Sequence, residues 1–292
     1  MKDSVYQLIT GRIIMMLQQG IVPWRQPWKA KSCWPRNLIS KKLYQGINVF
    51  LLHAMRYESP YWLTFHQARQ LGGMVRKSEK ATPIVFCRRI EKEDKEQEKR
   101  TVLVLRYWSV FNVAQCDGIG DVPAAPVRAP HDPMATAARI VESMPLRPQI
   151  THGFREAFYA TADDYIAMPN KADFASPEEY YAVLFHEMGH ATGHEKRLNR
   201  ESLRGAHGSD PSNYPREELC AEMTSAFLCG ESGIVDRTIQ NSAAYISEWL
   251  HRLKDDPKLV IHAAAQAQKA ADYILDRKAD EETAPVEQKE AA

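Results

Sequence analysis

The stretch SPEEYYAVLFHEMGHATGH constrains the fold more than any other part of this chain. It begins with Ser176, a favoured helix N-cap, and Pro177, which suits the first helical position. On the helix that this start predicts, His186 and His190 are four residues apart and lie on nearly the same face. Two imidazoles so placed can bind one metal ion, with Glu187 beside them as a general base that is not a ligand. The stretch therefore predicts a metal site built on a helix.

A third ligand is predicted farther along the chain, in PREELCAEM. Glu218 and Glu222 are again four residues apart, which matches zinc peptidases whose first acid binds the metal and whose second hydrogen-bonds a ligating histidine. We expect Glu218 to be the metal ligand and Glu222 to hydrogen-bond one of the ligating histidines. Glu217 is the competing ligand, about 100° around the same helix. The metzincin pattern is excluded because its third histidine would stand where Lys196 is.

Three further side chains are candidates for roles around this site. Tyr214, one helical turn before Glu218, and His207 could each hydrogen-bond a developing oxyanion. His194 follows Gly193, the expected end of the helix, and suits a place behind the ligands better than direct ligation. We expect one divalent ion, zinc by default and manganese as the alternative because one ligand is a carboxylate. A purely structural metal ion is disfavoured, since no cysteine near the motif could occupy its fourth coordination position.

Charge is divided unevenly along the 292 residues. Residues 1–120 carry 20 Lys and Arg against 9 Asp and Glu, a balance of +11, so the rest carries −10 although the net charge is only +1. Two halves of opposite net charge suggest two separate functions, and the positive charge of the first half favours a polyanion as its partner. The five cysteines are scattered and form no zinc-binding pair, which favours free thiols in a reducing cytoplasm.

The basic half also interleaves cations with aromatic residues. Aromatic faces that stack on bases, beside cations that follow phosphates, are what binding of single-stranded nucleic acid requires. Any one tryptophan would more readily be a core residue, so the excess of 15 Lys and Arg over 3 Asp and Glu in residues 1–90 is the stronger sign. The predicted DNA-binding residues are Trp24, Arg25, Trp28, Lys29, Lys31, Trp34, Arg36, Lys41, Lys42, Tyr44, Trp62, Arg76, Lys77 and Lys80.

Hydrophobic periodicity predicts an α+β protein. The first half has an amphipathic helix near its start, a turn and helix before the Gly72-Gly73 pair, and two strands around a charged hairpin tip; the second half is mostly helical, with a strand pair that turns at Asp163 and Asp164. No export signal or membrane span is expected. The predicted divisions are a small DNA-binding domain at 1–122, a Pro-rich linker at 123–133, a metallopeptidase domain at 134–278 and a disordered tail at 279–292.

An ordered series of motifs resembles ArdC-type antirestriction proteins. PWRQPW, YQGINVFLL, YWLTFHQARQLGGMVRKSEK and YWSVFNVAQCDG are similar to the single-stranded-DNA-binding domain of that family and to the N-terminal part of plasmid TraC-type primases. DDYIAMP, the HEMGH helix, YPREELCAEMTSAFL and AAYISEWL are similar to its zincin-like, gluzincin-type metallopeptidase domain. One departure is Ser78, where the family is expected to favour glycine.

The resemblance implies a protein of a conjugative plasmid or other mobile element that protects incoming DNA from host restriction. It supports His186, His190 and Glu218 as ligands and Glu187 as the base. The implied partners are single-stranded DNA and a host restriction enzyme or other protein substrate. Two alternatives stay open: a DNA-coating protein whose metal is structural, and a DNA-stimulated protease of DNA-bound proteins.

Overall fold

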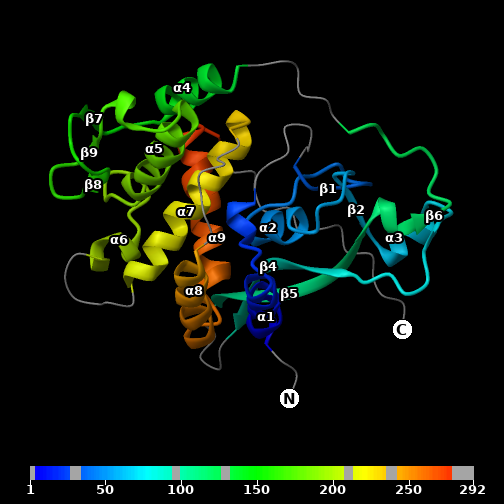
Figure 1. Ribbon diagram of the computed structural model, residues 1–292. Coiled ribbons are helices and arrows are strands. Elements are labelled where there is room, and N and C mark those ends of the chain that lie inside the picture. The colour runs from blue at the N-terminus through cyan, green and yellow to red at the C-terminus, as the bar shows by residue number, and fades with distance from the viewer. Residues whose placement is uncertain are drawn as a thin grey trace.

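The first half of the chain combines short helices with a sheet, in agreement with the α+β prediction (Figure 1). The structure, a computed structural model, describes residues 4–26, 34–93, 99–125, 132–206, 213–234 and 242–277. The elements of this half are α1 (Val5–Gln18), η1 (Pro23–Arg25), β1 (Arg36–Asn37), α2 (Ile47–His53), β2 (Tyr61–Thr64), α3 (Phe65–Gln70), β3 (Met74–Val75), β4 (Thr82–Glu93), β5 (Lys99–Asn112), η2 (Val113–Gln115) and β6 (Cys116–Asp117).

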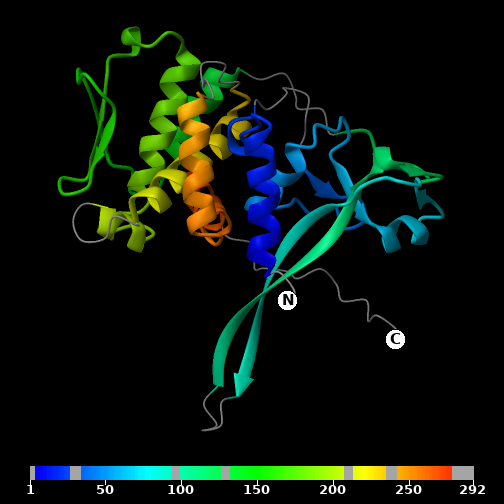
Figure 2. The same cartoon turned by 60° about the horizontal axis from the view of Figure 1, so that its bottom comes forward.

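The main sheet of this half has the strand order β1-β2-β5-β4, and β3 pairs separately with β6. Strands β4 and β5 form an antiparallel hairpin whose register runs from Thr82 opposite Val110 to Glu93 opposite Lys99. The hairpin projects from the body of the molecule (Figure 2). The two predicted strands are therefore confirmed, while the charged tip at 94–98 lies outside the described residues.

The segment before the Gly-Gly pair differs from the prediction of a turn and a helix. Residues Tyr61–Thr64 form strand β2, and the helix is confined to Phe65–Gln70. Thr64 separates the two because its hydroxyl accepts a hydrogen bond from the Gln67 amide and caps the helix. The strand was missed because its four residues are too few to show a periodicity of their own.

The second half places helices against a small sheet. Its three strands have the order β7-β9-β8, with the predicted turn at Asp163 and Asp164 between β8 and β9. Helix α5 starts at Ser176 and Pro177, as predicted. The elements are α4 (Pro133–Ser143), β7 (Gln149–His152), β8 (Phe158–Ala160), β9 (Tyr165–Met168), η3 (Lys171–Asp173), α5 (Pro177–Ala191), α6 (Glu201–Ala206), α7 (Asn213–Ser232), α8 (Ala243–Asp255) and α9 (Leu259–Ile274).

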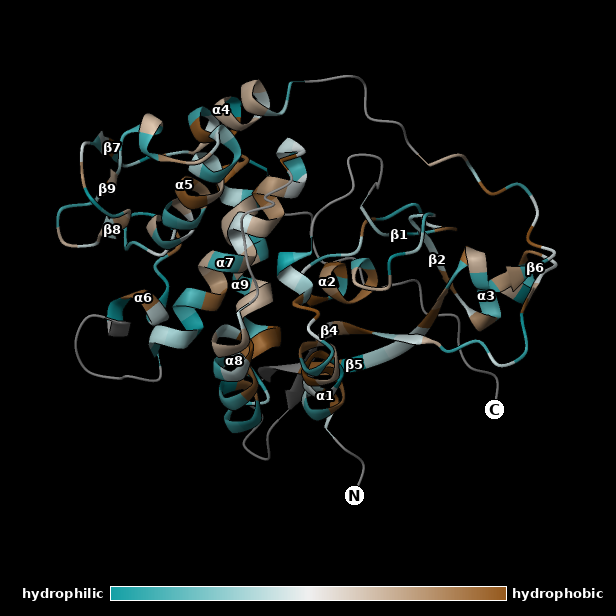
Figure 3. Cartoon of the chain, in the orientation of Figure 1, coloured by the Kyte–Doolittle hydropathy of each residue, from teal (hydrophilic) through white to brown (hydrophobic). Residues whose placement is uncertain are grey.

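One hydrophobic core runs through both halves. Helix α1 lies against α8 and α9, which agrees with the prediction that it docks, and it buries Ile9 and Ile13. Phe50 of α2 stacks on Phe227 of α7 with ring centroids 4.8 Å apart. Figure 3 shows hydrophobic colour on α2 and on the adjoining part of β4. The basic and the acidic half are therefore packed together and share buried surface.

Three further expectations concern membrane spans, the linker between the two halves and the C-terminal tail. None of the helices in the described ranges is long and apolar enough to cross a membrane. The middle of the predicted linker, residues 126–131, lies outside the described residues. The predicted tail at 279–292 lies outside them as well.

Candidate metal centre

Helix α5 presents the two histidines of the HEMGH motif to the same point. The Ser176 hydroxyl accepts a hydrogen bond from the Glu179 amide and so fixes where the helix begins. His186 stands ten residues after Ser176, and its Nε2 atom lies 3.1 Å from Nε2 of His190. Glu187 is on the same helix and is only 7 % exposed. The local spacing predicted from the sequence is therefore realised on a regular helix.

Helix α7 adds a carboxylate to this pair. The Oε2 atom of Glu218 lies 3.5 Å from Nε2 of His186, and its Oε1 atom lies 3.5 Å from Nε2 of His190. Two ligands held tetrahedrally at roughly 2.0–2.1 Å from a zinc ion lie about 3.4 Å from each other. The separations thus fit one small divalent ion. In the described part of the chain, these three residues are the only group of His, Cys, Asp or Glu side chains whose ligand atoms converge in this way.

The potential at this point also suits a cation. Burial lowers the pKa of His186, but the hydrogen bond to Glu218 and the charges of Glu187 and Glu218 outweigh it and raise the pKa. Carboxylates therefore dominate the local field, which is the condition under which a positive charge is stabilised.

A glycine inside the motif lets the two helices approach closely enough. A Cβ atom at Gly189 would lie 3.1 Å from Cα of Ala221 and 3.2 Å from Cβ of Thr224, both on α7. Contacts that short would push the helices apart. Gly189 therefore sets the spacing at which Glu218 reaches the histidines.

Glu217 lies behind His190, on the side away from Glu218. Its Oε1 atom lies 3.2 Å from Nδ1 of His190, and it accepts hydrogen bonds from Arg200 and Ser202. Burial raises the pKa of Glu217, but the hydrogen bonds from His190 and Arg200 outweigh it and lower the pKa to about 2. This carboxylate is held as an anion that orients the imidazole. Of the two adjacent glutamates, the geometry favours Glu218 as the ligand.

The prediction for Glu222 needs a correction. Its carboxylate was expected to hydrogen-bond a ligating histidine, but the partners that the structure places on it are Trp24, Tyr245 and Arg25. The indole Nε1 of Trp24 donates to it at 3.0 Å, and the guanidinium of Arg25 lies 3.5 Å above the Tyr245 ring. The reason is tertiary: η1 of the basic half lies against α7 at this turn.

The remaining candidates lie at the edge of the site. Tyr214 is 52 % exposed, and the charge of Glu218, followed by burial, raises the pKa of its hydroxyl. The Nδ1 atom of His194 accepts a hydrogen bond from the Lys196 amide and lies 4.0 Å from a carboxylate oxygen of Asp164, so this histidine stands outside the convergent group. His207 lies outside the described residues.

Sequence reasoning missed Arg200, which connects the parts of this site. It is 4 % exposed and donates hydrogen bonds to Glu217, to the Gly189 carbonyl at 2.8 Å and to the Thr192 hydroxyl at 2.6 Å. It thus joins the end of α5 to α7. Arg200 stands ten residues after the last motif histidine, in a loop without periodicity, so no sequence signal distinguished it from a surface arginine.

The aromatic residues predicted to bind DNA are mostly internal. The side chains of Trp24, Tyr44 and Trp62 are between 2 and 8 % exposed, so the stacking role predicted for them is not supported. Their rings instead fill hydrophobic clusters, and the Trp34 ring is tilted against Phe227. The stacking role was predicted wrongly because a tryptophan that is near cations in the sequence can still point into the hydrophobic core. Trp28, Lys29 and Lys31 lie outside the described residues.

The predicted cations within the described residues differ in their pairing and exposure. Arg25 and Arg76 form ion pairs with acidic residues, Arg76 with Glu79 and Asp117. Arg36 is partly buried, whereas Lys41, Lys42, Lys77 and Lys80 are exposed, as is the ion-paired Arg76. The turn beside the last two contains Ser78 with φ of +71°, a left-handed conformation that favours glycine. That geometry explains why glycine was expected there.

Comparison with known proteins agrees with this arrangement in both halves. Residues 3–111 match the family profile of the N-terminal domain of the anti-restriction factor ArdC. Residues 136–266 match the profile of a zincin-like metallopeptidase. The two matches together cover both the basic sheet half and the helices that carry the convergent side chains.

Solved structures of the antirestriction protein ArdC from plasmid R388 are similar over nearly their whole length. The metal-free structure is 37 % identical with a TM-score of 0.73, and the match covers 94 % of this chain and 97 % of that one. The Mn(II)-bound structure is 36 % identical with the same TM-score and covers 94 % and 98 %.

Two kinds of curated relatives match as well. An uncharacterised protein of Sinorhizobium fredii, y4eC, is 33 % identical over 293 residues, which is 95 % of this chain and 93 % of that protein. Two DNA primases TraC of Escherichia coli are 34 % and 33 % identical over 94 % of this chain. The chain spans only 27 % and 20 % of the length of these primases.

Proposed function

Because this chain belongs to the ArdC family of antirestriction proteins, we propose that it protects the incoming DNA of a conjugative plasmid or other mobile element from host restriction. It does so by binding single-stranded DNA and through a metal-dependent peptidase site. The observation that carries the proposal is the convergence of His186, His190 and Glu218 beside the buried Glu187.

The side chains have distinct roles in the proposed chemistry. His186, His190 and Glu218 would hold a divalent ion, which would supply Lewis acidity and lower the pKa of the reacting water to about 7. Glu187 accepts the proton of the attacking water and delivers it to the leaving amine. Tyr214 donates a hydrogen bond to the oxyanion of the scissile carbonyl.

The metal is proposed to be zinc or manganese. Two imidazoles and one carboxylate form the ligand set of many zinc peptidases, with an open fourth position for water. A carboxylate ligand also suits manganese, and the similar ArdC structure of plasmid R388 is described as Mn(II)-bound.

Binding of single-stranded DNA is supported by the charge of the first half. Residues 1–120 carry a balance of +11, and Lys41, Lys77 and Lys80 are exposed. These cations follow a phosphate backbone without reading sequence, so affinity falls steeply as salt is added. Exposed base faces are needed for stacking, which favours single strands over duplex.

The test is a restriction-protection assay in a recipient strain with the variant Glu187→Gln. The amide keeps the shape of the side chain and removes the base, and we expect protection to be lost while the metal stays bound. Glu195→Gln is the matched control, since Glu195 is an exposed glutamate just beyond the same helix. It should protect like the wild type.

Full protection by Glu187→Gln would contradict the peptidase role. It would favour a protein that protects DNA by coating it and whose metal ion has only a structural role. Cleavage by the wild type of proteins bound to DNA, with free proteins left intact, would instead identify a DNA-stimulated protease.

A further inference from the structure

The strand β5 exposes an aromatic pair that the fold leaves uncovered. Four consecutive residues are exposed, from Arg106 to Ser109, and Tyr107 and Trp108 have 52 % and 41 % of their surface accessible. Their partners across the hairpin, Val85 and Ile84, are only 7 % and 1 % exposed. At these two pairs, the β4 side chains are covered and the β5 side chains are open.

The strand register explains this opening. Strand β2 pairs with β5 from Val110 to Asn112, so among the described residues 106–109 have a strand neighbour on the β4 side alone. The free edge lies at the base of the projecting hairpin (Figure 2). All four residues of this stretch are exposed to a ligand.

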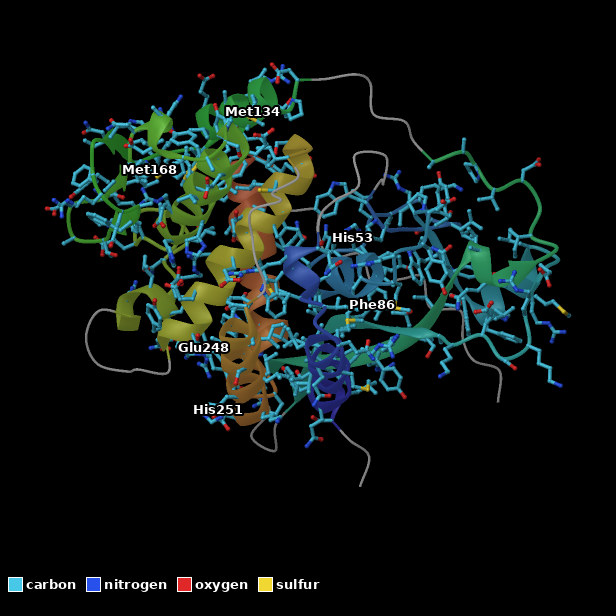
Figure 4. All side chains as sticks on the ribbon, viewed as in Figure 1. His53, Phe86, Met134, Met168, Glu248 and His251 are labelled. Carbon is cyan, nitrogen blue, oxygen red and sulfur yellow. The ribbon has the colours of Figure 1, made fainter. Side chains whose placement is uncertain are left out.

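The alternation of the strand places a cation beside one of the rings. Arg106 and Trp108 are two residues apart and so point to the same face of the sheet. Phe86, which Figure 4 labels, is paired with Arg106 on β4. Tyr107 points to the other face. Arg106 is exposed and forms no ion pair within the described ranges, which leaves its guanidinium available.

Few other aromatic rings of the basic half are available to a ligand. Within the described residues 4–26, 34–93 and 99–125, the large aromatic side chains that are exposed are those of Phe65, Tyr107 and Trp108. The Phe65 ring is accompanied by the guanidinium of Arg69, 5.9 Å from its centroid. Only Tyr107 and Trp108 form an adjacent pair.

We propose that Tyr107 and Trp108 stack on the bases of single-stranded nucleic acid while Arg106 contacts a phosphate. This inference rests on the proposed DNA binding and assigns the site for it. A single strand is the ligand because two adjacent rings on opposite faces of an open strand edge can accept unstacked bases, which a duplex doesn't offer. The balance of +11 in this half and the free guanidinium favour a polyanion over a peptide added to the strand edge.

The experiment measures binding of a fluorescein-labelled deoxythymidine oligonucleotide to the full chain at moderate salt. Trp108→Ala and Tyr107→Ala should each weaken binding on the order of 10-fold, because each removes one stacked base. Trp108→Phe keeps a ring and should retain most of the affinity. The controls are Phe65→Ala and Phe158→Ala, the latter 41 % exposed like Trp108 but in the other half, and both should bind like the wild type.

The outcomes separate this assignment from the proposed function. Unchanged affinity in both Trp108→Ala and Tyr107→Ala would overturn the stacking site while DNA binding by the chain stands. A loss as large in Phe65→Ala would overturn the assignment to this pair. Failure of the wild type to bind the oligonucleotide at all would overturn the proposed DNA binding itself.

Discussion

At the scale of single residues, the two histidines of α5 are the predicted centre of metal binding. Replacing both His186 and His190 by alanine removes two of three ligands, so we expect metal content to fall from one ion per chain to none. The increase in melting temperature on adding metal should disappear with it, because an ion stabilises only the state that binds it. Elemental analysis and thermal melts with and without zinc or manganese measure both effects.

The control for that experiment is His251→Ala. This histidine lies on α8, is labelled in Figure 4 and is 79 % exposed at its side chain. Its loss should leave metal content unchanged. One tightly bound ion in the double variant would show that the metal lies elsewhere.

Gly189 is the residue that sets the distance between α5 and α7. The Cβ of Gly189→Ala would meet Ala221 at 3.1 Å, and we expect this overpacking to cost about 1–3 kcal/mol of unfolding free energy and to weaken metal binding. Chemical denaturation and metal titration measure the two effects. Gly11→Ala in α1 is the control, since its added Cβ meets nothing within 4 Å and should stabilise the helix by up to about 1 kcal/mol. Unaltered metal affinity in Gly189→Ala would contradict this role.

At the scale of elements, one ion pair ties the turn between β8 and β9 to the segment after α5. Asp164 accepts hydrogen bonds from Arg197 and Tyr159, and Arg197 also donates to the Ala191 carbonyl at 2.6 Å. Burial raises the pKa of Asp164, but the hydrogen bonds from Arg197 and Tyr159 outweigh it and lower the pKa to about 2. The ionised carboxylate is therefore part of the folded structure.

The stabilisation by Asp164 should depend on pH with a definite sign. Since the folded pKa lies below the ordinary value of 3.8, the contribution is fully present above that value and is lost as the pH falls toward about 2. Asp164→Asn should reduce the unfolding free energy at neutral pH by about 1–3 kcal/mol. The difference from the wild type should shrink below about pH 4.

Denaturation at a series of pH values tests this. Asp163→Asn, a change at the exposed neighbouring position of the same turn, should leave stability nearly unchanged. A difference between Asp164→Asn and the wild type that stays constant down to the lowest pH would contradict the ion pair as its source.

At the scale of the whole molecule, the basic half contacts α7, the helix that carries Glu218, through η1. Trp24 donates to Glu222, which stands one helical turn after Glu218, and Arg25 lies over Tyr245 of α8. DNA that engages the segment around η1 would therefore act on α7. We expect peptidase activity on an unstructured protein to be low without single-stranded DNA and to rise with it, with a coupling of about 1–3 kcal/mol.

Trp24→Phe keeps the ring and removes the donor to Glu222, so the effect of DNA on activity should become smaller. Tyr6→Phe is the control, because the Tyr6 hydroxyl makes a contact between the same halves, at 3.3 Å from His262 of α9, away from α7. Proteolysis with and without oligonucleotide, with Glu187→Gln as the blank, measures the coupling. Equal activity in both conditions for the wild type would rule out the coupling and leave the peptidase proposal standing.

The sequence by itself determined the features that depend on neighbours along the chain. The Ser176 cap, the i,i+4 spacing of His186 and His190, and the two strands of the β4–β5 hairpin follow from local sequence patterns, and all three appear in the structure. The opposite charges of the two halves were also visible, because charge is a property of composition.

Only the tertiary structure decided which faces of these elements meet. The sequence favoured Glu218 but left Glu217 as a competitor, and the positions of the two carboxylates separate only when α7 lies against α5 at Gly189. Trp24 and Glu222 are 198 residues apart, and no local pattern relates them. The direction in which a tryptophan or a glutamate points depends on the packing of distant segments, since burial is a property of the assembled core and not of the residue type.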